Sequence, residues 1–175
     1  MSGRAFAHQT VQGIDIVKQL IAFDLDGTLA ESKQKIGGEM AGLLSQMLAR
    51  VSVAVISGGD WPQFEKQVVA ALPAPAAIEH LFIMPTTGTK LYRFIDGIWS
   101  PVYAEIFAPD ERDHILSALT EATKEAGFAD EKIWGERVED RGSQITFSGL
   151  GQEAPLDAKK AWDPDFAKRK AMQVL

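Results

Sequence analysis

The residues best suited to chemistry are two aspartates, Asp24 and Asp26, in the string Asp-Leu-Asp-Gly-Thr-Leu. They come at the end of the apolar run 20–25, which is typical of a strand buried in a parallel sheet. At the carboxyl end of such a strand both side chains can point into the ligand crevice, and Gly27 lets the chain turn away. Two close carboxylates repel unless a divalent cation binds between them, and hard oxygen ligands favour magnesium.

This pair of carboxylates predicts phosphoryl transfer. One aspartate can attack phosphorus as a nucleophile while the other passes a proton to the leaving oxygen. The alternative is a polar loop without function, because aspartate and glycine are common turn residues. The apolar strand in front of Asp24 and Asp26, together with a second matching element downstream, favours the functional interpretation.

That second element is Ser57, which ends the β-branched run 51–56 and precedes Gly58 and Gly59. If the two strands are neighbours, Ser57 and the backbone N–H groups after it lie where phosphoryl oxygens could bind. A Ser-Gly-Gly turn before a helix also needs no function, so this element gains its weight from the first.

The first half of the chain alternates strands with helices, which predicts a doubly wound α/β fold. The helices are recognised by apolar residues at helical spacing around 40–48 and by Asp60 as a cap with Pro62 in the first turn. The expected strands are 20–25, 51–56 and 81–84, and a polar loop follows at 85–89.

The pattern changes at Lys90 and predicts a small α+β insertion. Two apolar segments flank the turn signal at 96–97, an amphipathic helix is expected over 110–126, and a strand pair over 134–149. We therefore expect an α/β core in residues 1–85 and an α+β cap in residues 86–162. Residues 163–175 are expected to form a helical return towards the core.

Composition limits the class of protein. The chain has 175 residues, 46% of them hydrophobic, no cysteine and a net charge of -6. The scattered basic residues give no stripe for nucleic acid, and no apolar run is long enough to cross a membrane. We expect a cytoplasmic protein that binds neither nucleic acid nor membrane, and whose anionic substrate needs a local cation.

The string from Asp24 resembles the first motif of the haloacid dehalogenase superfamily, and Ser57 stands where the second motif places Ser or Thr. The resemblance implies a Rossmann-like core and assigns Asp24 as the aspartyl-phosphate nucleophile and Asp26 as the general acid and base. It also implies that Ser57, Gly58 and Thr28 bind phosphate. Asp24 and the backbone carbonyl of Asp26 would hold Mg2+.

A cap inserted after the third strand resembles that of subfamily IIB, which includes sugar phosphatases and phosphomannomutases. The segment from Arg141 to Gly151 is similar to the phosphomannomutase cap, in which a serine follows the arginine by seven residues, here Ser148. Arg141 and Ser148 would then contact the substrate. Where that family has Asn-Gly after the arginine this chain has Gly-Ser, and Gln152 replaces a later arginine. Arg141 is equally compatible with a solvated strand end.

The family's third motif, a lysine, and its fourth, an acidic pair, are not found before Leu175. Lysines such as Lys159 and Lys168 fit a solvated helix face, and the Asp-Pro-Asp at 163–165 fits a turn and helix start. The core sheet would then lack strands beyond the first, leaving an open edge. We expect either a fragment of a longer enzyme or a homo-oligomer that covers this edge.

The resulting hypothesis is a magnesium-dependent phosphohydrolase acting on a small phosphorylated metabolite, such as a sugar phosphate. A phosphomannomutase would use the same residues and return the phosphoryl group to the sugar. A third alternative, from another class, is a catalytically silent module that binds phosphate or a protein.

Overall fold

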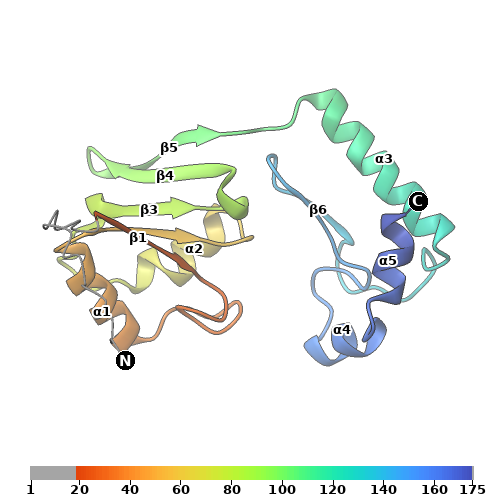
Figure 1. Ribbon diagram of the computed structural model, residues 1–175, viewed down its shortest axis with the longest axis horizontal. Helices are drawn as coiled ribbons and strands as arrows, with labels where there is room; N and C mark the ends of the chain where they lie inside the picture. Colours follow the sequence, from red (N-terminus) through yellow and green to blue (C-terminus); the bar gives the residue numbers. More distant parts are fainter. Residues whose placement is uncertain (1–18, 175) are drawn as a thin grey trace, which may run out of the picture.

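The computed structural model describes residues 19–174, and these form two lobes (Figure 1). The core lobe, residues 19–105, contains a five-stranded sheet in the order β1-β2-β3-β4-β5. Its strands are β1 (Leu20–Asp24), β2 (Ser52–Ile56), β3 (Leu81–Met84), β4 (Lys90–Ile95) and β5 (Ile98–Ala104). The second lobe comprises residues 107–174.

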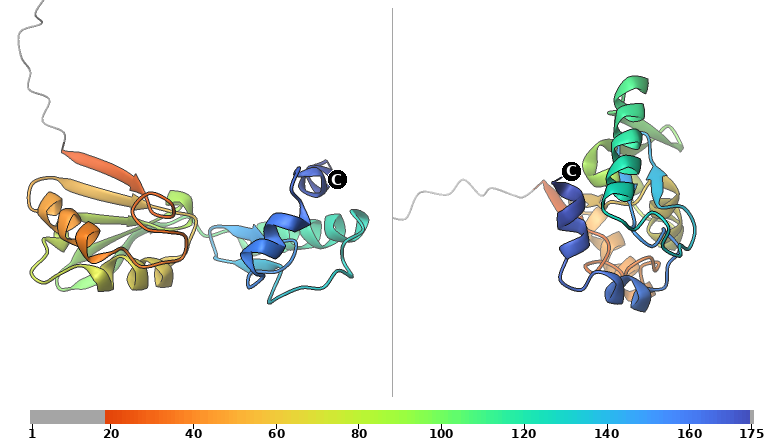
Figure 2. Two further views of the ribbon diagram at one scale, coloured as in Figure 1. Left: turned by 90° about the horizontal axis from the view of Figure 1, so that it is seen from below. Right: turned by 90° about the vertical axis from the view of Figure 1, so that its right-hand side faces the viewer.

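The first three strands are parallel, and each is joined to the next by a helical crossover. Helix α1 (Gly38–Leu48) connects β1 to β2, and α2 (Trp61–Gln67) connects β2 to β3. Because both crossovers step in the same direction along the sheet and such connections are right-handed, both helices fall on the same face, as Figure 2 shows. The predicted α/β class and an incomplete Rossmann-like core are confirmed, but both crossover helices of the described residues lie on one face, so the second helical layer of a doubly wound sheet is not seen within residues 19–174.

Local sequence explains where these elements begin and end. The Asp60 carboxylate accepts a hydrogen bond of 2.8 Å from the Trp61 backbone N–H, so it caps α2 as expected. In β2 the side chains of Val53, Ala54 and Val55 are all buried, which is why this strand is apolar throughout instead of alternating.

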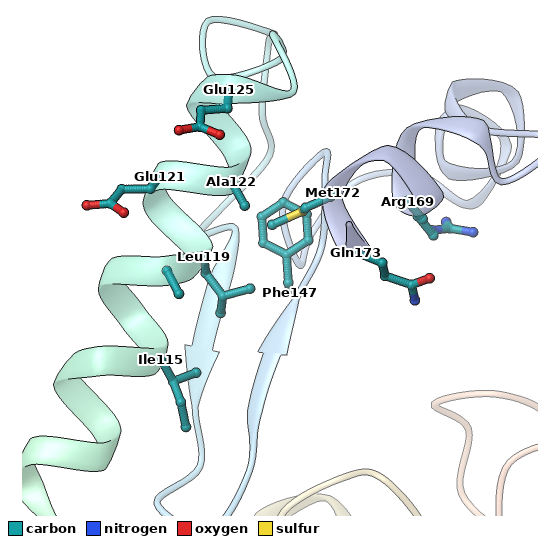
Figure 3. Close-up of a pocket in the computed structure, with 10 residues that line it drawn as sticks. Ile115, Leu119, Glu121, Ala122, Glu125, Phe147, Arg169, Met172 and Gln173 are labelled. Atoms are coloured by element: carbon teal, nitrogen blue, oxygen red, sulfur yellow. The ribbon is translucent and has the colours of Figure 1, made fainter. Parts of the chain in front are cut away.

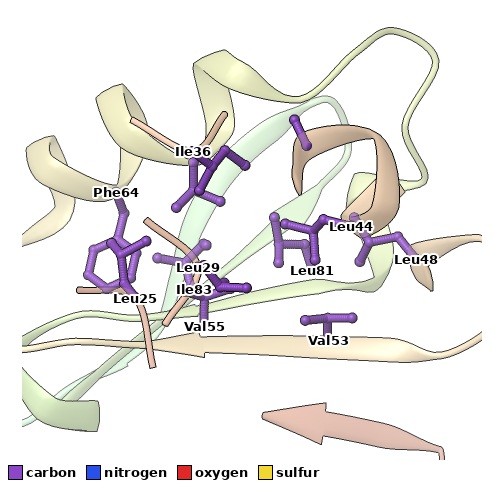
Figure 4. Close-up of a cluster of buried hydrophobic side chains, with 12 residues drawn as sticks. Leu25, Leu29, Ile36, Leu44, Leu48, Val53, Val55, Phe64, Leu81 and Ile83 are labelled. Atoms are coloured by element: carbon purple, nitrogen blue, oxygen red, sulfur yellow. The ribbon is translucent and has the colours of Figure 1, made fainter. Parts of the chain in front are cut away.

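The hydrophobic core lies between the sheet and the two helices (Figure 4). Phe64 from α2 and Leu48 from α1 are fully buried, and they pack with Val53, Val55 and Ile83 of the sheet. This packing fixes the helices against the strands, and so fixes the loops at the strand ends.

The β4–β5 hairpin corrects the predicted boundary of the core at residue 85. Its antiparallel form is as expected, but β4 pairs with β3 through Phe82–Arg93 and Ile83–Tyr92, so the hairpin extends the core sheet. Tyr92 also stacks on Trp61 of α2, with 4.5 Å between ring centroids. The change of pattern at Lys90 marks a change of strand direction and not the start of a new lobe.

The second lobe combines a long helix, a short hairpin and two short helices. They are α3 (Pro109–Glu125), β6 (Val138–Asp140), β7 (Ile145–Phe147), α4 (Leu156–Trp162) and α5 (Ala167–Gln173). Trp162 packs edge-on against Phe128, with ring centroids 5.3 Å apart.

The helical tail does not return to the core lobe as predicted. Helix α5 instead packs beside α3, and an apolar groove of about 580 Å³ lies between them, with Phe147 and Met172 in its wall (Figure 3). Asp163 is buried and accepts hydrogen bonds from the backbone N–H groups of Lys168 and Arg169, which confirms the helix start. Lys168 forms an ion pair with Glu131 at 2.6 Å, so it is not the solvated residue that the sequence suggested.

Strands β1 and β5 are the two edges of the sheet within residues 19–174, and β1 is the edge that the sequence predicted to be open. Its outward side chains are exposed, and Leu20 keeps 52% of its surface in solvent. The predicted open edge is confirmed, whereas its coverage by another chain stays a prediction. In the described residues, no helix is both long and apolar enough to cross a membrane.

We expect Phe64→Ala to lower the free energy of unfolding by about 3–5 kcal/mol, because the ring is fully buried at the centre of the core. Urea unfolding followed by fluorescence measures this loss. Phe166→Ala, at a ring that is 56% exposed, is the matched control and should change stability by less than about 1 kcal/mol. Equal losses in both variants would contradict the assigned core.

Candidate active site

The Asp26 carboxylate is held by three hydrogen-bond donors from different parts of the core lobe. Its Oδ1 accepts from the Lys33 backbone N–H at 2.9 Å. Its Oδ2 accepts from the Ser57 hydroxyl at 3.2 Å and from the Gln63 side-chain amide at 3.1 Å. The two predicted motifs therefore meet directly, because β1 and β2 are parallel neighbours whose carboxyl ends lie at one edge of the sheet.

Asp24 is the last residue of β1 and pairs in register with Ile56 of β2. Asp24 is exposed to solvent, and no group in the described residues donates a hydrogen bond to its carboxylate. Gly27 has a φ of +85° and its N–H donates to the Ala30 carbonyl at 2.7 Å, so the chain turns away immediately after Asp26. The site thus pairs an accessible carboxylate with a fixed one.

The loop after β3 forms two backbone hydrogen bonds with the loop after β2. Thr87 donates its N–H to the Ser57 carbonyl at 2.9 Å, and Thr86 donates its N–H to the Gly59 carbonyl at 2.9 Å. The backbone of Thr86 and Thr87 has a positive φ, +51° and +60°, in the left-handed region that is unfavourable for β-branched residues. These contacts keep the two threonines in that conformation.

A buried ion pair that the sequence did not reveal anchors the same loop. Lys90 at the start of β4 places its Nζ 2.8 Å from Asp60 Oδ1, and its side chain is only 9% exposed against 29% for Asp60. Asp60 is therefore both the cap of α2 and the counterion of a buried lysine. The only sequence signal was a lysine at the first position of a strand whose partner lies thirty residues earlier.

The second lobe reaches this loop through the turn between β6 and β7. Arg141 donates to the Gly58 carbonyl and, at 2.7 Å, to Glu139. Gln144 donates to the Thr87 hydroxyl at 3.1 Å, and Ser143 lies 3.0 Å from the Thr86 hydroxyl. Arg141, predicted to serve the site from the cap, therefore lies beside Ser57, and its buried Nε has no hydrogen-bond partner in residues 19–174.

Two other predicted site residues lie elsewhere. Thr28 is exposed and lines an apolar groove against α1, together with Phe23 and Leu29. Ser148 lies at the end of the β6–β7 hairpin opposite to Arg141, and its hydroxyl donates to the Gly151 carbonyl at 2.8 Å. The structure brings together Asp24, Asp26, Ser57, Gly58 and Arg141, but not Thr28 or Ser148.

The expected magnesium ligands fit a site with few protein ligands. Asp24 offers an accessible carboxylate at the strand end, and the chain turn at Gly27 follows the Asp26 carbonyl. Mg2+ commonly binds through one or two carboxylates and fills its remaining positions with water and phosphate oxygens. Residues 19–174 contain no cluster of three or more acidic, histidine or cysteine side chains suited to a metal.

Asp140, the last residue of β6, joins the short β6–β7 hairpin to the long helix α3. The Gly142 backbone N–H donates to its carboxylate at 2.7 Å, and the Arg112 guanidinium of α3 donates to the other oxygen. The Gly142 hydrogen bond, followed by the Arg112 contact, lowers the pKa of Asp140. The ionised form is therefore favoured in the folded protein.

We expect the Asp60→Ala variant to be less stable than the Lys90→Met variant. Removing Asp60 strips the cap from α2 and leaves a buried ammonium unpaired, which costs about 3–5 kcal/mol. Lys90→Met keeps an apolar stem and leaves Asp60 bonded to Trp61, at a cost of about 1–2 kcal/mol. Urea unfolding of both single variants and the double variant tests this order, and the reverse order would contradict it.

We expect Asp140→Asn to lower the melting temperature at pH 7. A carboxylate whose pKa is lowered by folding stabilises the protein above its unfolded pKa of about 3.9, and this stabilisation is lost as the pH falls through the folded value. The difference from wild type should therefore shrink below about pH 4. Asp130→Asn, at an exposed position, is the control, and a difference independent of pH would argue against the assigned cause.

Comparison with known proteins gives a short sequence match. No model of a known protein family matches the chain. Human phosphomannomutase 1 is 39% identical over 49 residues, which cover 28% of this chain and 19% of that protein. The mouse phosphomannomutase 1 is 37% identical over 49 residues with the same coverage. The match thus spans about a fifth of these relatives.

Solved structures share the fold over most of the chain. An N-terminally truncated IMP-nucleotidase of Plasmodium falciparum superposes with a TM-score of 0.58 at 13% identity, over 90% of this chain and 49% of that one. The ATP-bound form of the same nucleotidase gives a TM-score of 0.57 at 14% identity, over 73% and 34%. Together the comparisons show that this chain shares the fold of these nucleotidase structures, and that a segment of 49 residues is similar in sequence to phosphomannomutase 1.

Proposed function

We propose that the chain carries the nucleophile of a magnesium-dependent phosphohydrolase that acts on a small phosphorylated metabolite. The observation that carries the proposal is the hydrogen bond between Asp26 and Ser57, beside the accessible carboxylate of Asp24. It supports a site in which one carboxylate is free to react while the other is held in place. The phosphomannomutase similarity supports a sugar phosphate as the substrate.

In this mechanism the Asp24 carboxylate attacks phosphorus and forms an aspartyl phosphate, while Asp26 gives a proton to the leaving oxygen. Asp26 then removes a proton from water, which attacks the aspartyl phosphate and releases inorganic phosphate. Ser57 and the backbone N–H groups of the following loop support the phosphoryl oxygens. Asp24 and the Asp26 carbonyl would hold Mg2+, which would neutralise charge on the phosphoryl oxygens.

The second lobe is proposed to act as the cap over this site. Arg141 lies against the Gly58 carbonyl, and its buried Nε has no partner among residues 19–174, which supports a role in binding an anionic substrate. Closure of such a lobe excludes bulk water and so protects the aspartyl phosphate. The apolar groove between α3 and α5 lies in this lobe and away from the predicted site residues.

A phosphomannomutase is the second candidate, because the sequence match is to enzymes of that name. It would use Asp24 and Asp26 in the same first step and return the phosphoryl group to a sugar hydroxyl. The products separate the two: a hydrolase releases inorganic phosphate, and a mutase yields an isomeric sugar phosphate.

The rival from another class is a phosphate-binding module without turnover. The buried Lys90 already pairs with Asp60, so it does not supply a free positive charge to the nucleophile. Within residues 19–174, Arg141 is a cation that contacts the loop after Ser57, and Mg2+ would add positive charge at the phosphoryl oxygens.

We expect the chain to hydrolyse p-nitrophenyl phosphate in the presence of Mg2+, and Asp24→Asn to lower the rate by at least about 10³-fold because the amide cannot attack phosphorus. Release of p-nitrophenolate measures the rate. Asp96→Asn, in the exposed turn between β4 and β5, is the matched control and should keep the wild-type rate.

The assay distinguishes the proposals. Turnover that Asp24→Asn removes supports the nucleophile, whereas equal rates in wild type and Asp24→Asn would overturn it. Phosphate binding by an inactive wild type, measured by calorimetry, would favour the silent module.

A further inference from the structure

Helix α2 presents two glutamines, Gln63 and Gln67, towards the predicted site. They are four residues apart and therefore lie on the same face of the helix. The Gln63 Nε2 donates to Asp26 Oδ2 at 3.1 Å and to Gln67 Oε1 at 3.0 Å. Gln67 is 3% exposed, so this ladder runs from the buried base of α2 to the carboxylate.

The ladder fixes the orientation of the Gln63 amide. The NH2 group and not the carbonyl oxygen faces Asp26 Oδ2, as it must whenever this carboxylate is ionised and can only accept hydrogen bonds. Its second N–H is bound by Gln67, whose backbone carbonyl also accepts from the Ile36 N–H at 3.0 Å. The Gln63 amide that binds Asp26 is therefore itself fixed by its hydrogen bond to Gln67.

Gly59 makes room for this amide. A Cβ built at Gly59 would overlap the Oε1 and Cδ atoms of Gln63, whereas its φ lies outside the left-handed region. A larger residue at Gly59 would therefore have to displace the flexible end of the Gln63 side chain, and backbone freedom is not what distinguishes glycine here. The second glycine of the Ser-Gly-Gly loop is explained by a contact that the sequence did not reveal.

We propose that Gln63 is a positioning residue that orients Asp26 for proton transfer to the leaving group. The inference rests on the proposed function, in which Asp26 is the proton donor. When Gln63 is removed, two of the three hydrogen bonds to the Asp26 carboxylate remain, one from Ser57 and one from the Lys33 N–H. The carboxylate therefore stays in the site but is oriented less tightly.

This role predicts selectivity for the leaving group. An alkoxide must receive a proton as it departs, whereas p-nitrophenolate is stable without one. Misplacement of the acid by about 1 Å costs on the order of 10²-fold in rate. We therefore expect Gln63→Ala to lower kcat/KM for a hexose phosphate by that factor and kcat/KM for p-nitrophenyl phosphate by less than about 3-fold. The ratio kcat/KM reports the step in which the leaving group departs and not the later attack of water on the aspartyl phosphate, which both substrates share.

A second variant reaches the same contact without changing Gln63. Gly59→Ala displaces the amide by its added methyl group and should reproduce the selective loss. Because both variants break one contact, the double variant should lose no more than either alone. Gln46→Ala, on the exposed side of α1, is the matched control and should leave both rates unchanged.

The experiment measures kcat and KM of the whole chain with both substrates and Mg2+, together with the melting temperature of each variant. A selective loss of kcat/KM with the hexose phosphate in both variants supports the positioning role. An equal loss of kcat/KM with both substrates, or no loss, overturns it.

A wild-type chain without turnover would count against the proposed function, and the inference is then decided by NMR. The side-chain amide signal of Gln63, assigned by comparison with Gln63→Ala, should move in Asp26→Ala if the contact exists. An unmoved signal in Asp26→Ala overturns the inference.

Discussion

The register of the three parallel strands is the constraint on which the site depends. Asp24 pairs with Ile56, and Ile56 pairs with Met84, so the strands end level with one another. The loops that follow them must then meet, and this is why Asp26, Ser57 and the Thr86–Thr87 backbone share hydrogen bonds. A slip of one residue in β1 would turn its inward side chains outward and separate the two carboxylates from Ser57.

Sequence patterns predicted the parts of this arrangement that follow from local rules. The strands, both crossover helices and the Asp60 cap follow from apolar runs and capping residues, and the meeting of Asp26 with Ser57 follows from the parallel order. The Gln63 and Lys90 contacts could not be predicted, because they depend on how side chains pack between elements. The hairpin was assigned to the cap because a change of strand direction resembles a domain boundary in a single sequence.

The second lobe shows the same division between local and long-range information. Its helix and hairpin follow from spacing, and the turn after β6 carries Arg141 to the Gly58 carbonyl of the core lobe, while the contact of Arg141 with a substrate stays a prediction. Ser148 was placed by its distance along the sequence from Arg141, but the intervening β7 takes it to the far end of the hairpin. The spacing of two residues along a motif therefore does not give their distance across a hairpin.

Three hydroxyl groups form hydrogen bonds where the two lobes meet: those of Thr86 and Thr89 in the core lobe and that of Ser143 in the second lobe. Each hydroxyl can both donate and accept, and each can rotate to suit its neighbours, so the junction has more than one proton arrangement. Water offers the same donors and acceptors, so hydration can replace each contact at little net cost. These hydroxyl contacts therefore set the relative orientation of the lobes at little energetic gain, and the charged Arg141 side chain, which donates to the Gly58 carbonyl, adds the stronger contact across the same junction.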